Sequence, residues 1–156
     1  MAIEIERKFR VVAALWAKKS ASLSYDCIQQ AYLSNNPLIT IRVRIKETTA
    51  FLTLKSTEKG LQRQEFEYSI PLQDAKAMLA LCSGAIIQKK RYYYPLGSHV
   101  WEIDVFEGPN QGLIVAEIEL QDQNERFDKP AFVAEEVSLD TKYRNLSLSQ
   151  YPFCTW

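Results

Sequence analysis

The feature that most constrains this chain is an alternation of apolar and polar residues that recurs in eight separate segments. A repeat of two residues is the period of a β-strand whose two faces meet different surroundings. The alternating segments are 3–9, 28–34, 39–46, 51–56, 63–69, 86–94, 99–106 and 113–120. Residues typical of turns separate many of them, at 35–37, 58–60, 95–98 and 108–112. The pattern predicts an antiparallel meander of eight strands joined by short turns.

Helical segments interrupt this alternation and help to define the fold class. Residues 73–83 carry apolar side chains at helical spacing and end before Gly84, while 12–21 and 140–149 are further helix candidates. An open sheet exposes two edges that can pair with other chains, and closure into a barrel removes both. We therefore expect a mainly β (α+β) fold: an eight-stranded antiparallel closed β-barrel with a few flanking helices, in a single domain over residues 1–156. An open sheet or a sandwich is the alternative.

One face of most predicted strands carries charged residues, often in blocks of one sign. Strand 39–46 places Arg42 and Arg44 on one face. Strand 113–120 likewise places Glu117 and Glu119 on one face. Side chains two residues apart on a strand lie about 7 Å from each other, so like charges in a block repel. The simplest interpretation is a solvated sheet face. In the alternative, divalent cations neutralise the carboxylates and a polyanion neutralises the arginines and lysines.

The two signs are balanced on these faces. The basic residues expected there are Lys8, Arg42, Arg44, Lys46, Lys55, Arg63, Lys89 and Arg91. The acidic residues expected there are Glu4, Glu6, Glu65, Glu67, Glu102, Asp104, Glu117 and Glu119. If the barrel is closed, the charged face can be its lumen, and a polyphosphate bridged to Mg²⁺ or Mn²⁺ would match both sets. The apolar face would then point outward under the helices.

The composition argues against several other classes of protein. Nineteen Lys and Arg residues balance nineteen Asp and Glu residues, which argues against a general nucleic-acid or anionic-membrane binder. No apolar run approaches the roughly 20 residues that cross a bilayer. Cys27, Cys82 and Cys154 are far apart and show neither metal-ligand spacing nor a disulfide framework. Because the first ten residues are also highly charged, we expect no signal peptide and a cytoplasmic protein.

The order of the charged motifs resembles that of the CYTH superfamily, the triphosphate tunnel metalloenzymes. The chain begins with the family's E-x-E-x-K motif and carries its late E-x-E motif more than a hundred residues later. In family order, the matching residues are Glu4, Glu6 and Lys8, QAYL at 30–33, Arg42 and Arg44, Lys55, Arg63 with Glu65 and Glu67, Lys89 and Arg91, Asp104, and Glu117 with Glu119. The segment 136–148 is similar to the C-terminal signature, so the resemblance spans nearly the whole chain.

Two positions depart from the family pattern. Val133 and Ala134 stand where the family often has Leu-Gly before its C-terminal signature. Lys90 is an extra lysine beside Lys89, and strand parity favours Lys89 as the residue that faces the lumen. Neither departure removes a residue that the resemblance assigns to metal or phosphate binding.

The resemblance implies a barrel that encloses a tunnel, a divalent metal requirement and a triphosphate-containing substrate. The implied metal ligands are Glu4, Glu6, Glu117 and Glu119. The implied phosphate-binding residues are Lys8, Arg42, Arg44, Lys55, Arg63, Lys89 and Arg91. The implied catalytic residues are Lys8, Arg42, Arg44, Glu65, Glu67 and Asp104, of which the three acids would hold a second metal or the attacking water. Tyr143 and Arg144 are expected to close the tunnel from the C-terminal segment.

We therefore expect a hydrolase that uses Mg²⁺ or Mn²⁺ to convert inorganic tripolyphosphate to pyrophosphate and phosphate. The alternatives are a class IV adenylyl cyclase, a thiamine or nucleoside triphosphatase, and a polyphosphate-binding module without catalysis. The acid pairs argue against the module, because phosphate binding alone needs only the basic residues. The expected partner is a small-molecule polyphosphate, and the apolar outer wall of the barrel also allows a homodimer.

Overall fold

The computed structural model describes residues 2–34 and 36–156, and Asn35 of the predicted turn at 35–37 lies outside this part of the chain. The strands are β1 Ala2–Val11, β2 Tyr25–Ser34, β3 Ile39–Lys46, β4 Thr49–Ser56, β5 Gln62–Ile70, β6 Ser83–Leu96, β7 His99–Phe106, β8 Ile114–Glu119 and β9 Val133–Glu136. The helices are α1 Ala13–Ser20, α2 Leu72–Leu81 and α3 Asn145–Gln150, with the 3-10 helices η1 Gly108–Asn110, η2 Thr141–Tyr143 and η3 Phe153–Thr155. Among the described residues, no helix has the length and apolar character needed to cross a membrane.

The strands close into a barrel because β1 pairs with two neighbours that lie at the ends of the strand order. That order is β5-β4-β3-β2-β6-β7-β8-β1. Residues 2–5 of β1 pair with β5, and residues 6–10 pair with β8, both in antiparallel fashion. The closed eight-stranded antiparallel barrel is thus confirmed, and β9 adds a short ninth strand beside the end of β1.

The connectivity of the strands is not a simple meander, so that part of the prediction is wrong. The strands β2 to β5 form one meander and β6 to β8 form another, but β6 pairs with β2 and β1 lies between β5 and β8. The helices account for the difference, because α1 follows β1 and α2 follows β5. A helical connection allows the next strand to join the sheet away from its predecessor, whereas a tight turn does not.

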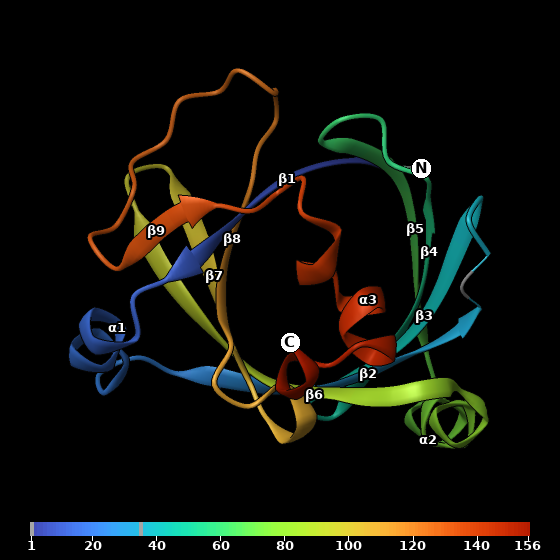
Figure 1. Ribbon diagram of the computed structural model, residues 1–156. Coiled ribbons are helices and arrows are strands. Elements are labelled where there is room, and N and C mark those ends of the chain that lie inside the picture. The colour runs from blue at the N-terminus through green and yellow to red at the C-terminus, as the bar shows by residue number, and fades with distance from the viewer. Residues whose placement is uncertain (1, 35) are drawn as a thin grey trace.

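The apolar face of the strands points outward, and helices cover it in two places (Figure 1). Trp16 of α1 belongs to one apolar cluster with Ile5 and Phe9 of β1. Ala75 and Leu79 of α2 belong to another, with apolar side chains of β2, β3 and β4. Burial of these side chains stabilises the barrel from its outer side. The inner face is left to the charged residues of the same strands.

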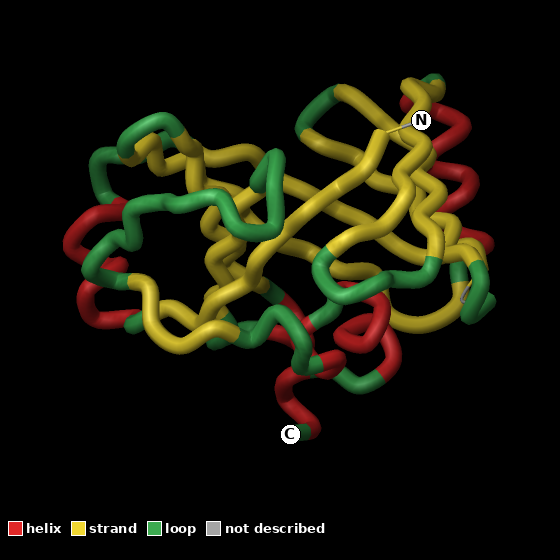
Figure 2. Tube along the Cα trace, turned by 90° about the horizontal axis from the view of Figure 1, so that it is seen from above, coloured by secondary structure: helices red, strands yellow, loops and turns green. Residues whose placement is uncertain are grey.

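The C-terminal segment fills one end of the barrel. The strands surround α3 in Figure 1, and Figure 2 shows the C-terminus at one end of the strands. The predicted helix at 140–149 is divided into η2 and α3 by Arg144, whose backbone is extended. Leu148 of α3 lies in one apolar cluster with Phe106 and Val115, which are on the inner faces of β7 and β8. The interior is therefore apolar at this end and charged in the remainder.

Candidate active site

Charged side chains on the inner barrel face surround a cavity of about 1170 Å³. Strand alternation places them there, because the apolar residues between them pack outward. The predicted site residues that line the cavity are Glu4, Glu6, Lys8, Arg42, Arg44, Lys55, Arg63, Glu65, Glu67, Arg91, Glu117 and Glu119. Closure of the barrel thus brings residues of strands as far apart in the sequence as β1 and β8 into one cavity.

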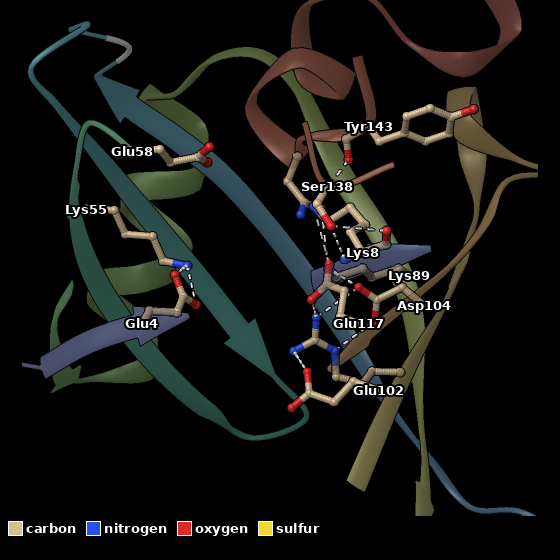
Figure 3. Close-up of polar contacts among 12 residues, drawn as sticks. Glu4, Lys8, Lys55, Glu58, Lys89, Glu102, Asp104, Glu117, Ser138 and Tyr143 are labelled. Atoms are coloured by element: carbon tan, nitrogen blue, oxygen red, sulfur yellow. Dashed lines mark hydrogen bonds and ion pairs between the residues drawn. The ribbon is translucent and has the colours of Figure 1, made fainter. Parts of the chain in front are cut away.

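Two predicted site residues, Lys89 and Asp104, lie behind the cavity wall. Both side chains are fully buried, and Lys89 Nζ lies 2.6 Å from Asp104 Oδ2 (Figure 3). Asp104 also accepts hydrogen bonds of 2.7 and 2.8 Å from Arg91, which does line the cavity. Burial lowers the pKa of Lys89 to about 7, although the charge of Asp104 opposes that change. Lys89 and Asp104 therefore support Arg91 from behind.

Strand parity predicts correctly which of the two neighbouring lysines on β6 faces inward. Lys89 lies on the inner face, whereas the Nζ of Lys90 lies 4.9 Å from the centre of the Tyr25 ring. Parity is a poorer guide near the strand ends. Lys46, at the end of β3, lies 3.5 Å from Asp26 and is not among the described residues that line the cavity.

Glu4, one of the predicted metal ligands, is held by two basic residues. It accepts hydrogen bonds of 2.9 Å from both Lys55 and Arg63, as Figure 3 shows for Lys55. Burial alone would raise the pKa of Glu4, but the charges of Lys55 and Arg63 outweigh it and lower this pKa to about 2. Lys55 is shared, since its Nζ also lies 3.2 Å from Glu65.

Glu117 is held in a similar way on the opposite side of Figure 3. It lies 3.5 Å from Lys8 and 3.4 Å from Arg91. Burial would raise the pKa of Glu117, but Lys8 and Arg91 lower it well below its usual range. Arg91 also pairs with Glu102, so this guanidinium serves several acids at once.

Glu6 and Glu119 are the predicted metal ligands that lack a basic partner. They lie opposite each other in the pairing of β1 with β8, and among the described residues neither forms an ion pair or a hydrogen bond. Burial and the nearby charges of Glu117 and Glu4 raise the pKa of Glu6 to about 8. Burial, followed by the charge of Glu4, also raises the pKa of Glu119. Both carboxylates therefore lie where a cation would lower the free energy of the ionised form.

The four glutamates do not meet at one point. Nowhere in residues 2–34 and 36–156 are three or more His, Cys, Asp or Glu side chains grouped closely enough to hold a metal ion together. Because a closed barrel pairs its first and last strands, all four glutamates are expected to converge on one metal site; of the four, only Glu6 and Glu119 lie opposite each other in the pairing of β1 with β8. Ion pairs with lysine and arginine account for the difference, because they hold Glu4 and Glu117 to other parts of the wall.

Arg42 and Arg44 of β3 form the cationic part of the wall. Arg42 lies 3.8 Å from Glu67, and its buried Nε has no hydrogen-bond partner. Arg44 donates from Nε to Gln30 at 2.8 Å and forms no ion pair within the described chain. Burial, together with the charges of Arg42 and Arg91, lowers the pKa of Arg44 to about 9. This wall therefore carries positive charge that few anions of the protein neutralise.

Comparison with known proteins identifies the family of the chain. The model of the family described as the CYTH domain matches residues 2–152 of the chain. This protein belongs to the CYTH family. The resemblance that the motifs indicate is thereby confirmed over nearly the full length of the sequence.

Relatives of this CYTH protein are named inorganic triphosphatase. An inorganic triphosphatase of Acetivibrio thermocellus is 37% identical over 154 residues, covering 98% of this chain and 97% of that protein. An inorganic triphosphatase of Nitrosomonas europaea is 34% identical over 150 residues, covering 94% and 96%. A crystal structure of an inorganic triphosphatase aligns with a TM-score of 0.68 at 31% identity, over 96% of this chain and 95% of that one.

The C-terminal segment of the CYTH domain contributes to the cavity in a way that was only partly predicted. Arg144 lines the cavity, whereas the Tyr143 side chain packs in one apolar cluster with Leu148 of α3; closure of a tunnel by these residues stays a prediction. Gln30 and Glu58, which bind Arg44 and Arg144, were not predicted as site residues. Gln30 belongs to the QAYL motif, whereas Glu58 lies in a loop, where alternation gives no signal.

Proposed function

We propose that this CYTH protein is a metal-dependent triphosphatase that hydrolyses inorganic tripolyphosphate to pyrophosphate and phosphate inside its barrel. The proposal rests chiefly on unneutralised charge of both signs in one cavity. Among the described residues, Arg44 forms no ion pair and Arg42 has only the distant Glu67, at 3.8 Å, while the facing pair Glu6 and Glu119 has no basic partner. A tripolyphosphate with a divalent cation supplies both kinds of missing charge. The relatives named inorganic triphosphatase support the same substrate class.

Arg42 and Arg44 are the leading phosphate ligands in this proposal. A planar guanidinium can donate two parallel hydrogen bonds to phosphate oxygens, and such charge-assisted bonds are stronger away from bulk water. The other basic residues of the wall would exchange part of their carboxylate contacts for phosphate oxygens; they are Lys8, Lys55, Arg63 and Arg91. Lys89 and Asp104 would act on phosphate through Arg91, which they position.

Glu6 and Glu119 fit a hard divalent cation such as Mg²⁺ or Mn²⁺. Carboxylate oxygens are the preferred ligands of such ions, and a cation would offset the repulsion that raises the pKa of Glu6. In this proposal Glu6 and Glu119 hold the ion, and Glu4 and Glu117 would join them only after exchanging their present ion pairs with Lys55 and Arg91. When bound, the ion would neutralise charge on the phosphate oxygens.

Glu65 and Glu67 are the candidates to orient the attacking water. Glu67 accepts a hydrogen bond of 3.0 Å from Thr53, which fixes its position beside Arg42. A carboxylate can accept the proton of a water molecule that attacks the terminal phosphorus. The arginines would stabilise the charge on the transferred phosphoryl group while the bond to the bridging oxygen breaks and pyrophosphate leaves.

An assay panel tests the proposal. Purified protein is incubated with Mg²⁺ or Mn²⁺ and with tripolyphosphate, ATP, thiamine triphosphate or pyrophosphate, and phosphate and cyclic AMP are measured. We expect phosphate release, fastest from tripolyphosphate. Cyclic AMP formation without phosphate release would support a cyclase and overturn the proposal. Tight binding of tripolyphosphate without turnover of any substrate would instead support a binding module.

A further inference from the structure

Three consecutive residues of the C-terminal segment join different parts of the cavity wall. The carbonyl of Tyr143 accepts a hydrogen bond of 3.5 Å from Lys8 Nζ on β1. Asn145 Oδ1 accepts one of 3.3 Å from Lys89 Nζ on β6. Arg144, between them, reaches the loop that joins β4 to β5. Figure 3 shows Lys8 and Lys89 together on one side of the site and the acidic residue of that loop, Glu58, on the other.

Within the described part of the chain, the side chain of Arg144 is held in the cavity by one contact. Its Nη2 donates to Glu58 Oε2 at 2.6 Å, while its Nε is buried and has no hydrogen-bond partner. Glu58 is itself shared, since its other oxygen lies 3.4 Å from Arg63. The extended backbone at Arg144, between η2 and α3, directs this side chain into the cavity that Arg42 also lines. One guanidinium is thus only partly satisfied at a place where a polyanion would be bound.

We propose that Arg144 is a further phosphate-binding residue and that Glu58 competes with the substrate for its guanidinium. The inference rests on the proposed function and adds a ligand from outside the barrel strands. The pair is partly exposed, with side-chain exposures of 38% for Arg144 and 23% for Glu58, and ion pairs of this kind are weak. A polyphosphate offers more charged oxygens than one carboxylate, and it can engage Nε together with Nη2. Glu58 then keeps its contact with Arg63.

A purely structural role for the pair predicts a different outcome. If the contact between Glu58 and Arg144 only fastens the C-terminal segment to the loop between β4 and β5, loss of either partner weakens the same contact. Both substitutions would then change the KM for tripolyphosphate in the same direction. Competition predicts opposite directions, because removal of Glu58 frees Arg144 whereas removal of Arg144 takes the ligand away.

Four proteins are compared in KM for tripolyphosphate and in Kd by calorimetry: wild type, Arg144→Gln, Glu58→Gln and the double variant. We expect Arg144→Gln to raise both constants about tenfold, which is typical of a lost charge-assisted hydrogen bond. Glu58→Gln should lower both constants. In the double variant most of the effect of Glu58→Gln should disappear, and any remainder measures the release of Arg63, the other basic partner of Glu58. Arg144→Lys should restore part of the affinity, since it retains the charge.

A matched control and two contrary results complete the test. Glu125→Gln removes another carboxylate from the cavity lining, one that pairs with His99, and should leave KM nearly unchanged. Glu58→Gln and Arg144→Gln raising KM together would overturn the inference in favour of the structural contact. An equal fall in KM on Glu58→Gln with and without Arg144 would overturn it in favour of general repulsion. If wild type binds tripolyphosphate without hydrolysing it, the proposed function fails while Kd still tests Arg144; if it binds none, both fail.

Discussion

Replacement of Glu6 by Gln is expected to stabilise the metal-free protein at neutral and alkaline pH, although Glu6 lines the cavity. The folded protein raises the pKa of Glu6 from the ordinary value of 4.5 to about 8. Between these two pH values the folded state binds more protons than the unfolded chain, so stability falls as the pH rises. A glutamine cannot ionise and therefore removes this penalty.

The magnitude follows from the same two pKa values. A pKa difference of one corresponds to about 1.4 kcal/mol, so the penalty at pH 7 reaches about 3 kcal/mol. Because Glu6 is partly exposed and solvent screens its charge, we expect a gain of about 1–3 kcal/mol in the free energy of unfolding. For a protein of this size that gain corresponds to about 2–4 °C in Tm per kcal/mol.

The assay is urea unfolding of wild type and Glu6→Gln in EDTA at pH 5 and pH 8. The variant should be more stable at pH 8 and nearly equal to wild type at pH 5. Added Mn²⁺ should stabilise the wild type more than the variant, because the variant has lost one of the two facing carboxylates. Glu4→Gln is the matched control on the same strand face, and it should be less stable than wild type, since Lys55 and Arg63 lower the pKa of Glu4 to about 2. A Glu6→Gln variant that is no more stable than wild type at pH 8 would refute the reasoning.

Three further predictions concern the remaining charges. Arg44→Gln should raise the Kd for tripolyphosphate about tenfold or more, measured by calorimetry. It should not lower Tm, because the substitution removes a half-buried charge that forms no ion pair within the described chain. Lys89→Met should lower the free energy of unfolding by about 3 kcal/mol in urea while changing KM less than Arg44→Gln does, because Lys89 pairs with Asp104 behind the wall. Removal of divalent ions with EDTA should abolish phosphate release, and Mg²⁺ or Mn²⁺ should restore it; activity that persists in EDTA would contradict the metal assignment.

The alternation of residues was sufficient to predict the strands and the direction of most charged side chains, because both depend on local geometry. The segments 39–46 and 99–106 have the predicted bounds, since turn residues flank them closely. Val133–Glu136 was missed as a strand, because four residues are too few to show a period. A closed barrel pairs its first and last strands, which correctly predicts β1 beside β8, but the pairing of β1 with β5 was beyond the pattern, since alternation does not specify which strands become neighbours.

The site was predictable as a set of residues but not as a set of contacts. Parity placed Glu4 and Glu6 together on the inner face, yet it could not distinguish the ion-paired Glu4 from the unpaired Glu6. That difference arises from Lys55 and Arg63, which reach Glu4 from β4 and β5 only after the sheet has closed. Likewise, Arg91 lines the cavity whereas its partner Asp104 is buried in the cavity wall. The spacing of residues along a strand does not predict how far each side chain lies from the cavity.

Because β1 pairs with both β5 and β8, it is the strand that closes the barrel. During synthesis β1 emerges first, but its partner β8 emerges more than a hundred residues later, so the ring cannot close until β8 has been made. The same final step brings Glu6 opposite Glu119. A cation bound by Glu6 and Glu119 would stabilise the pairing of β1 with β8. The two carboxylates face each other only in the closed barrel, so the free energy of binding would favour that state over the open chain. The ion would then serve the assembly of the barrel as well as its chemistry.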